Sequence, residues 1–155
     1  RMTDIQGALG AAQMERAEAI VSERRTLAVV YDAAFADLDW LRTPTVSDGF
    51  EHGYQSYPCM FRPDDITLDS VVTINAERNA WMEELQALGI STRPATHAVH
   101  MLSFYAKKYS LTPEAFPIAY AANHCSISLP LFHGMAADEQ DQVIETVRTT
   151  APSAA

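Results

Sequence analysis

Arg93, His97 and His100 form the most distinctive group of potentially functional side chains, within the segment Arg-Pro-Ala-Thr-His-Ala-Val-His. Guanidinium and imidazole groups both donate hydrogen bonds, so donors of this kind close together suit an anion or a sugar hydroxyl. The two histidines could equally be loop residues whose hydrogen bonds are satisfied locally. We therefore treat His97 and His100 as candidate binding residues, with a purely structural role as the alternative.

A metal site is a third interpretation of the two histidines. His124 and Cys125 would supply further ligand types. The sequence lacks the Cys-x-x-Cys and His-Glu-x-x-His spacings that typify zinc sites, so we expect no metal site. It also contains no Gly-rich phosphate loop and no recognisable Ser/His/Asp order.

Arg1 and the lysines are the other cations that could take part in chemistry. Arg1 precedes a predicted helix N-terminus, where backbone N–H groups and a guanidinium would both attract a phosphate; a solvated chain end is the alternative. Lys107 and Lys108 are the only lysines among eleven basic residues. A Schiff-base lysine needs burial or a cationic neighbour to lower its pKa. We expect these adjacent lysines to lie on a solvated helix face.

The amino-acid composition excludes several classes of protein. The chain has 155 residues with a net charge of −9, and 48% of its residues are apolar, which suits one globular domain and argues against nucleic-acid binding. We expect no membrane partner, because no apolar run approaches the roughly 20 residues that span a bilayer. Two cysteines make a poor disulfide framework, so we expect reduced thiols and a cytoplasmic location.

The elements that would position these side chains begin with a long helix. The residues from Thr3 to Gln6 fit a capping box, in which the Thr3 hydroxyl and the Gln6 amide bond to each other's backbone N–H. Apolar residues then recur at helical spacing, and no proline interrupts them before Pro44. The helix could run for about 30 residues. We expect residues 1–40 to form a helix that links two domains.

Short strands and helices are predicted for the rest of the chain. Strands are expected at residues 54–61, 66–72, 90–93 and 126–131, and helices at residues 74–88, 101–109, 112–124 and 138–148. Pro58 predicts that the first strand lies at an edge or contains a bulge. The pattern indicates an α+β fold, with residues 41–150 as a small C-terminal α/β domain and residues 151–155 as a tail.

Several motifs, taken in order, resemble the DegT/DnrJ/EryC1/StrS family of sugar aminotransferases. They begin with Arg-Met-Thr-Asp-Ile-Gln-Gly-Ala-Leu-Gly at residues 1–10 and continue with Tyr-Gln-Ser-Tyr at residues 54–57. Thr-His-Ala-Val-His follows at residues 96–100, and Ser-Leu-Pro-Leu-Phe-His at residues 128–133. Each motif alone is weak evidence, but together they span most of residues 1–148 in the order of the family.

The resemblance implies the C-terminal small domain of a fold type I transferase that depends on pyridoxal phosphate. Such a domain has a small antiparallel sheet with helices packed on it and a long N-terminal linking helix. Family members are more than twice as long as this chain. The resemblance therefore implies that the cofactor is bound mainly by an N-terminal half outside these residues, which also carries the Schiff-base lysine. We expect no catalytic residue in this chain, and no transamination by the chain alone.

By the same resemblance, Arg1, His97 and His100 would bind substrate. The complete enzyme would transfer an amino group from glutamate to a nucleotide-activated keto-deoxysugar, in deoxyaminosugar or surface polysaccharide biosynthesis, and would act as a homodimer. The alternative is a non-catalytic module for dimerisation or sugar-nucleotide binding, derived from the same fold. One departure from the family is Ala137, which stands where a helix-capping Thr or Ser is usual; we expect it to cost about 1 kcal/mol of helix stability.

Overall fold

A three-stranded antiparallel sheet lies at the centre of the protein, whose computed structural model describes residues 1–150. The strands, in the order β1-β2-β3, are β1 (Leu41–Arg42), β2 (Tyr57–Phe61) and β3 (Ser126–Leu129). The helices are α1 (Asp4–Met14), α2 (Ala17–Phe35), α3 (Val71–Ala87), α4 (Ser103–Tyr109), α5 (Pro117–Cys125) and α6 (Ala137–Thr149). The predicted α+β fold with a small antiparallel sheet is confirmed. The predicted tail lies outside the described residues.

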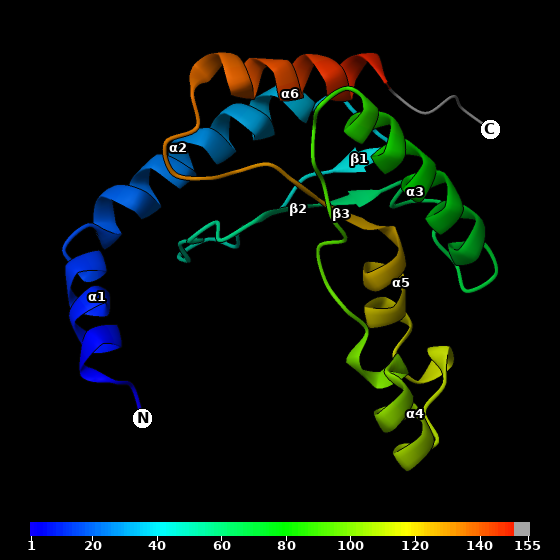
Figure 1. Ribbon diagram of the computed structural model, residues 1–155. Helices are drawn as coiled ribbons and strands as arrows, with labels where there is room; N and C mark the ends of the chain where they lie inside the picture. The colour runs from blue at the N-terminus through cyan, green and yellow to red at the C-terminus, as the bar shows by residue number, and fades with distance from the viewer. Residues whose placement is uncertain (151–155) are drawn as a thin grey trace.

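The helices differ in how much they contribute to the packing around this sheet. Figure 1 shows α2 and α6 side by side along one side of the sheet, and these two helices are in contact. α3 packs against α5, which leads directly into β3. α1 extends away from the rest of the protein and contributes no buried residue to the core. The elements that pack together are therefore α2, α3, α5, α6 and the sheet.

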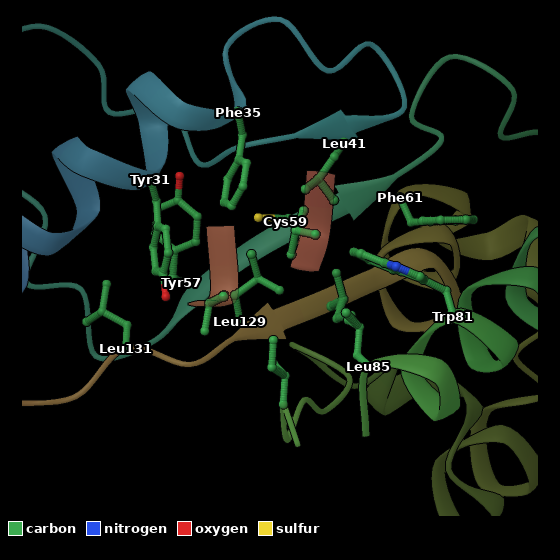
Figure 2. Packing of buried hydrophobic residues seen from close by; sticks show 14 of the residues in the cluster. Tyr31, Phe35, Leu41, Tyr57, Cys59, Phe61, Trp81, Leu85, Leu129 and Leu131 are labelled. Carbon is green, nitrogen blue, oxygen red and sulfur yellow. The ribbon is translucent and has the colours of Figure 1, made fainter. Parts of the chain in front are cut away.

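The hydrophobic core fills the space between the sheet and the helices. Alternate residues of β2 (Tyr57, Cys59 and Phe61) are buried, as the period of two in a strand requires. Figure 2 shows them among side chains from α2 and α3, with Tyr31 against Tyr57 and Trp81 against Phe61. The face of β2 that carries these three buried residues is therefore the face on which the helices pack.

The predicted long helix is divided into two helices at Glu15 and Arg16. The Arg16 N–H donates to the Gln13 carbonyl, a tighter i−3 hydrogen bond in place of the α-helical i−4 bond. α2 is held in place because its buried face, which includes Leu27, packs in the core, whereas α1 buries nothing. The predicted capping box at Thr3 is confirmed.

Pro58 lies in the central strand rather than in an edge strand, which corrects the prediction. β1 is so short that it pairs only with Met60 and Phe61. Beside Pro58 the sheet therefore has a neighbour on the β3 side alone, through the pairing with Ser128. A proline is tolerated here because no second strand needs its missing N–H.

The predicted strand at residues 66–72 is wrong, because residues 68–70 form a turn that leads into α3 at Val71. The Thr67 N–H donates to the Ser70 hydroxyl at 2.8 Å, and the Ser70 N–H donates to the Thr67 hydroxyl at 3.1 Å. This reciprocal pair satisfies N–H groups at the helix start, as a capping box does. At the other end Gly89, with φ of 87°, follows the C-cap Leu88 and allows the Ile90 N–H to reach the Leu85 carbonyl.

Two other predicted elements are shorter than expected. The predicted strand at residues 90–93 is reduced to a single bridge between Arg93 and Ser128. The predicted helix at residues 112–124 is divided into a 3₁₀ turn (Pro113–Ala115) and α5. The residue between them, Phe116, is extended with φ of −144° and ψ of 69°, because the proline that follows it disfavours a helical backbone there.

The cap of α6 is Ala136, so the predicted assignment to Ala137 is wrong by one residue. The Ala136 N–H donates to the Glu139 carboxylate at 2.8 Å, but Ala136 has no side-chain oxygen to accept from the first turn. We predict that Ala136→Ser raises the free energy of unfolding by about 1 kcal/mol. Urea unfolding would measure it. Ala137→Ser is the matched control, and an equal gain from it would show that the cap is misplaced.

Asp37 and Arg148 join the end of α2 to α6. The Arg148 guanidinium donates to both Asp37 carboxylate oxygens, at 2.7 and 2.8 Å, and thereby lowers the pKa of Asp37 to about 2. Since the folded pKa is depressed, the pair stabilises the fold above the ordinary value of 3.8, and this contribution is lost as the pH falls towards about 2. We predict that the stability difference between the protein and Asp37→Asn shrinks over this range. Unfolding at a series of pH values checks it, and a constant difference would contradict the assignment.

Candidate functional site

The segment from Arg93 to His100 is anchored to the core at both ends. The Arg93 carbonyl accepts from the Ser128 N–H of β3 at 2.7 Å. The Ala98 N–H donates to the Asn123 side-chain oxygen of α5 at 3.0 Å. A 3₁₀ turn (Val99–Met101) then leads towards α4. The sheet and α5 therefore fix the backbone that carries both candidate histidines.

His97 and His100 differ in exposure despite their close spacing. His97 is exposed, whereas His100 is only 8% exposed and its ring lies 5.1 Å from the Phe116 ring, between centroids. Within residues 1–150 the buried Nε2 of His100 has no hydrogen-bond partner. A buried polar atom of this kind normally finds a partner, so the unpaired Nε2 marks His100 as a position where a partner is expected. His97 is free to bind only from the solvent side.

Arg1 lies far from the two histidines. It is exposed and precedes the capped N-terminus of α1. In Figure 1 the N-terminus and α4 lie at opposite sides of the protein. The structure therefore brings His97 and His100 onto one segment, but it does not bring Arg1 to them within this chain.

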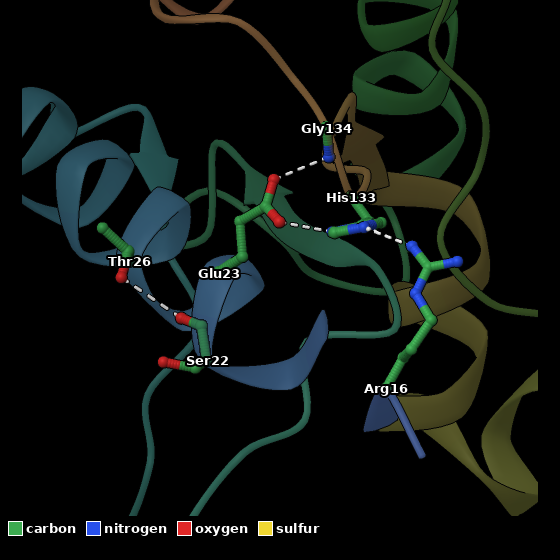
Figure 3. A network of polar contacts seen from close by, with 6 residues as sticks. All are labelled: Arg16, Ser22, Glu23, Thr26, His133 and Gly134. Carbon is green, nitrogen blue, oxygen red and sulfur yellow. Dashed lines mark hydrogen bonds and ion pairs between the residues drawn. The ribbon is translucent and has the colours of Figure 1, made fainter. Parts of the chain in front are cut away.

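A polar network at the junction of α1 and α2 has no counterpart in the sequence-based predictions. Figure 3 shows that Glu23 of α2 accepts hydrogen bonds from the Gly134 N–H, at 2.6 Å, and from Nδ1 of His133. Nε2 of His133 lies 3.2 Å from the Arg16 guanidinium. No motif could have predicted this network, since 111 positions separate Glu23 from Gly134.

The two ring nitrogens of His133 face different partners. Arg16 can only donate a hydrogen bond, so Nε2 of His133 accepts, and Nδ1 carries the proton that is donated to Glu23. The Gly134 N–H, together with His133, lowers the pKa of Glu23, which stays ionised. The network thus joins the start of α2 to the turn that precedes α6, beside the break between α1 and α2.

The two lysines do not fit a cofactor site for pyridoxal phosphate. Both are exposed on α4. The Lys108 ammonium lies 5.3 Å from the ring centroids of Phe104 and Tyr109, as expected of a solvated cation–π contact. Neither lysine has the burial that a Schiff-base lysine needs. The described residues therefore supply no lysine suited to hold this cofactor.

The thiols are unsuited to metal binding or nucleophilic chemistry. Cys59 and Cys125 are unpaired and buried, and burial raises the pKa of Cys125 to about 11 and that of Cys59 further. Residues 1–150 contain no group of three His, Cys, Asp or Glu side chains placed to hold a metal ion. Over the same residues, no helix combines the length and apolarity required to cross a bilayer.

Exposed large apolar side chains are frequent in two regions of the protein. The first region is α1 and its flanks, with Met2, Ile5, Leu9 and Met14. The second region is α4 and the start of α5, with Phe104, Tyr109, Phe116 and Ile118. Apolar exposure on this scale is typical of surfaces that other protein segments cover.

Sequence comparison assigns the chain a family. The model of the DegT/DnrJ/EryC1/StrS aminotransferase family matches residues 1–148. The GDP-perosamine synthase of Vibrio cholerae is 28% identical over 148 residues, which are 96% of this chain and 37% of that protein. The spore coat polysaccharide biosynthesis protein SpsC of Bacillus subtilis is 29% identical over 147 residues, 95% of this chain and 36% of SpsC. The chain thus spans little more than a third of these relatives.

Solved structures show the same fold. The apo form of Spr1654 from Streptococcus pneumoniae, described as a sugar aminotransferase, superposes with a TM-score of 0.82 and 26% identity, over 97% of this chain and 35% of that one. Spr1654 is also known in forms with PLP and PMP. Helicobacter pylori PseC superposes with a TM-score of 0.79 over 97% of this chain and 38% of PseC, at 21% identity, a likeness of fold alone. The predicted fold class, the small α+β domain of a fold type I transferase, is confirmed.

Proposed function

The chain belongs to the DegT/DnrJ/EryC1/StrS aminotransferase family, and from this premise we propose that it is the substrate-binding C-terminal part of a sugar aminotransferase. The complete enzyme would transfer an amino group from glutamate to a nucleotide-activated keto-deoxysugar, for surface polysaccharide biosynthesis. The observation that carries this proposal is the match of the family model to residues 1–148. The name of the GDP-perosamine synthase relatives supports a sugar nucleotide as the substrate class.

Pyridoxal phosphate would supply the chemistry of amino transfer, because its ring withdraws electrons from the reacting carbon. Lys107 and Lys108 are exposed and unsuited to hold it. We therefore assign the cofactor to a part of the enzyme outside these residues, and we assign binding and orientation to this chain. A cytoplasmic enzyme fits the reduced, buried thiols.

His97, His100 and Arg1 are the residues that we assign to substrate. The imidazoles would donate to hydroxyl or phosphate oxygens of the sugar nucleotide, and the buried, unpartnered Nε2 of His100 favours this role. Arg1 lies away from the histidines in this chain, so in a homodimer it would serve the site of the partner subunit. The exposed apolar residues of α1 are compatible with such a dimer.

The proposed reaction can be tested by tracing the nitrogen atom of labelled glutamate into the product. The complete polypeptide that contains residues 1–155 is incubated with pyridoxal phosphate, ¹⁵N-labelled glutamate and a GDP-linked keto-deoxysugar. We expect a ¹⁵N-labelled amino sugar nucleotide in the mass spectrum. Binding of the sugar nucleotide without nitrogen transfer, across GDP-, UDP- and dTDP-linked keto sugars, would support the alternative of a non-catalytic binding module, which the two exposed lysines also favour.

A further inference from the structure

A small pocket lies beside the sheet, away from the residues assigned to substrate. Its volume is about 290 Å³, and three segments meet there: residues 55–56 before β2, residues 91–93, and residues 128–131 at the end of β3. The pocket contains none of Arg1, His97 and His100. It therefore requires an explanation separate from the proposed aminotransferase site.

Backbone hydrogen bonds hold the walls of the pocket in place. The Ser128 N–H donates to the Arg93 carbonyl at 2.7 Å, which joins two of the walls. The Arg24 guanidinium of α2 donates to the carbonyls of Tyr54 and Gln55, each at 2.9 Å, and so fixes the third wall. Walls held in this way lose little freedom when a ligand binds.

The polar groups in the pocket are suited to a negative charge. The polar residues that line it are Arg93, Gln55, Ser56, Ser91, Thr92 and Ser128, and each of their side chains can donate a hydrogen bond. Among residues 1–150 no carboxylate lines the pocket, although the chain has 20 acidic residues and a net charge of −9. A cationic side chain beside several hydroxyl donors, with no acid among them, is an arrangement that favours an oxyanion over a cation.

Two of these groups lack partners in the described part of the chain. The Thr92 hydroxyl is buried and makes no hydrogen bond within residues 1–150. Over the same residues the Arg93 guanidinium has neither a hydrogen bond nor an ion pair. Ser128, only 6% exposed, lines the same pocket. Because buried polar groups are normally paired, the unpaired Thr92 hydroxyl points to a missing acceptor, and Arg93, which is exposed, supplies the positive charge of the lining.

We propose that this pocket binds a small oxyanion, the carboxylate or phosphate group of a small molecule, with Arg93 as the countercharge and Thr92 as a hydrogen-bond donor. The guanidinium fork matches two oxygens of either group. The small volume limits the ligand to the oxyanion and a few further atoms. The proposal does not depend on the amino-transfer reaction, since it concerns a pocket without any residue assigned to that reaction.

The test is a titration of the full chain with inorganic phosphate and, separately, with acetate, at constant ionic strength. Amide ¹H–¹⁵N resonances of Ser91, Thr92 and Ser128 report occupancy. We expect saturating shifts at these residues with one of the two anions, which identifies the source as phosphate or carboxylate. Arg93→Met should weaken that binding by roughly 10-fold or more, because a charge-assisted hydrogen bond is lost.

Two further variants separate specific binding from an effect of net charge or of a change in fold. Lys107→Met removes the same charge from an exposed site on α4 and should leave the affinity unchanged. Thr92→Val keeps the side-chain shape, and it should weaken binding without a change in fold, judged by the remaining amide resonances. The proposal is overturned if neither anion gives saturating shifts. It is also overturned if Arg93→Met and Lys107→Met weaken binding equally, because that would reflect net charge alone.

Discussion

Replacing Trp81 by alanine is expected to lower the free energy of unfolding by about 3–5 kcal/mol, the range for a large aromatic residue lost from a core. Trp81 is 3% exposed and packs against two rings, Trp40 at 5.1 Å and Phe61 at 5.7 Å between centroids. Its indole N–H donates to the Thr150 hydroxyl at 2.9 Å. The substitution would therefore leave a cavity beside the sheet and remove the hydrogen bond to the Thr150 hydroxyl.

Urea unfolding followed by circular dichroism would measure this loss. Phe50→Ala is the matched control, since Phe50 is an exposed aromatic residue and its loss should change stability by no more than about 0.5 kcal/mol. A loss below about 1 kcal/mol for Trp81→Ala would contradict the core described here.

Replacing His100 by phenylalanine is expected to raise KM for the sugar nucleotide by roughly 10- to 100-fold, with little change in kcat, in the complete enzyme. Phenylalanine preserves the ring that packs against Phe116, but it removes the buried Nε2 that has no partner within residues 1–150. We expect Nε2 to bind the substrate equally strongly in the ground state and in the transition state. Loss of this contact would therefore raise KM and leave kcat nearly unchanged. Steady-state kinetics with varied sugar nucleotide would separate the two constants.

The control for this prediction is His52→Phe, which removes an exposed histidine from a different loop and should leave KM unchanged. Both variants should retain the circular dichroism spectrum of the unmodified enzyme. A drop in kcat with KM unchanged would contradict a binding role for His100 and would indicate a part in proton transfer.

Local sequence signals predicted those elements whose causes are local. The capping box at Thr3 predicts the start of α1, and the apolar spacing of Trp81 and Leu85 predicts α3. Each of these signals depends only on residues within one or two helical turns. Gly89 marked the end of α3 because its positive φ costs glycine little. The family resemblance added the domain type, which no local signal contained.

The errors arose where a local pattern had two interpretations. Ile66, Leu68 and Val71 have the apolar content of a strand, but the hydrogen bonds between Thr67 and Ser70 start a helix there. The break between α1 and α2 was missed because both sides have good helical spacing. Only the tertiary packing distinguishes them, since α2 is buried and α1 is not.

The sequence could predict which residues belong to the candidate site, but not how these residues are arranged in space. His97 and His100 are the same residue type three positions apart, and the burial of one of them depends on Phe116, which follows a separate helix. The Glu23–His133 contact and the pocket at Arg93 each join segments distant in sequence. Such contacts follow from the fold and not from spacing.

The central claim is that this chain binds substrate while the cofactor lysine lies elsewhere in the enzyme. The most direct measurement is to reduce the complete polypeptide with borohydride in the presence of pyridoxal phosphate and to map the modified peptide by mass spectrometry. We predict one modified lysine outside residues 1–155, with Lys107 and Lys108 unmodified. Modification of Lys107 or Lys108, or of no lysine at all, would contradict the account.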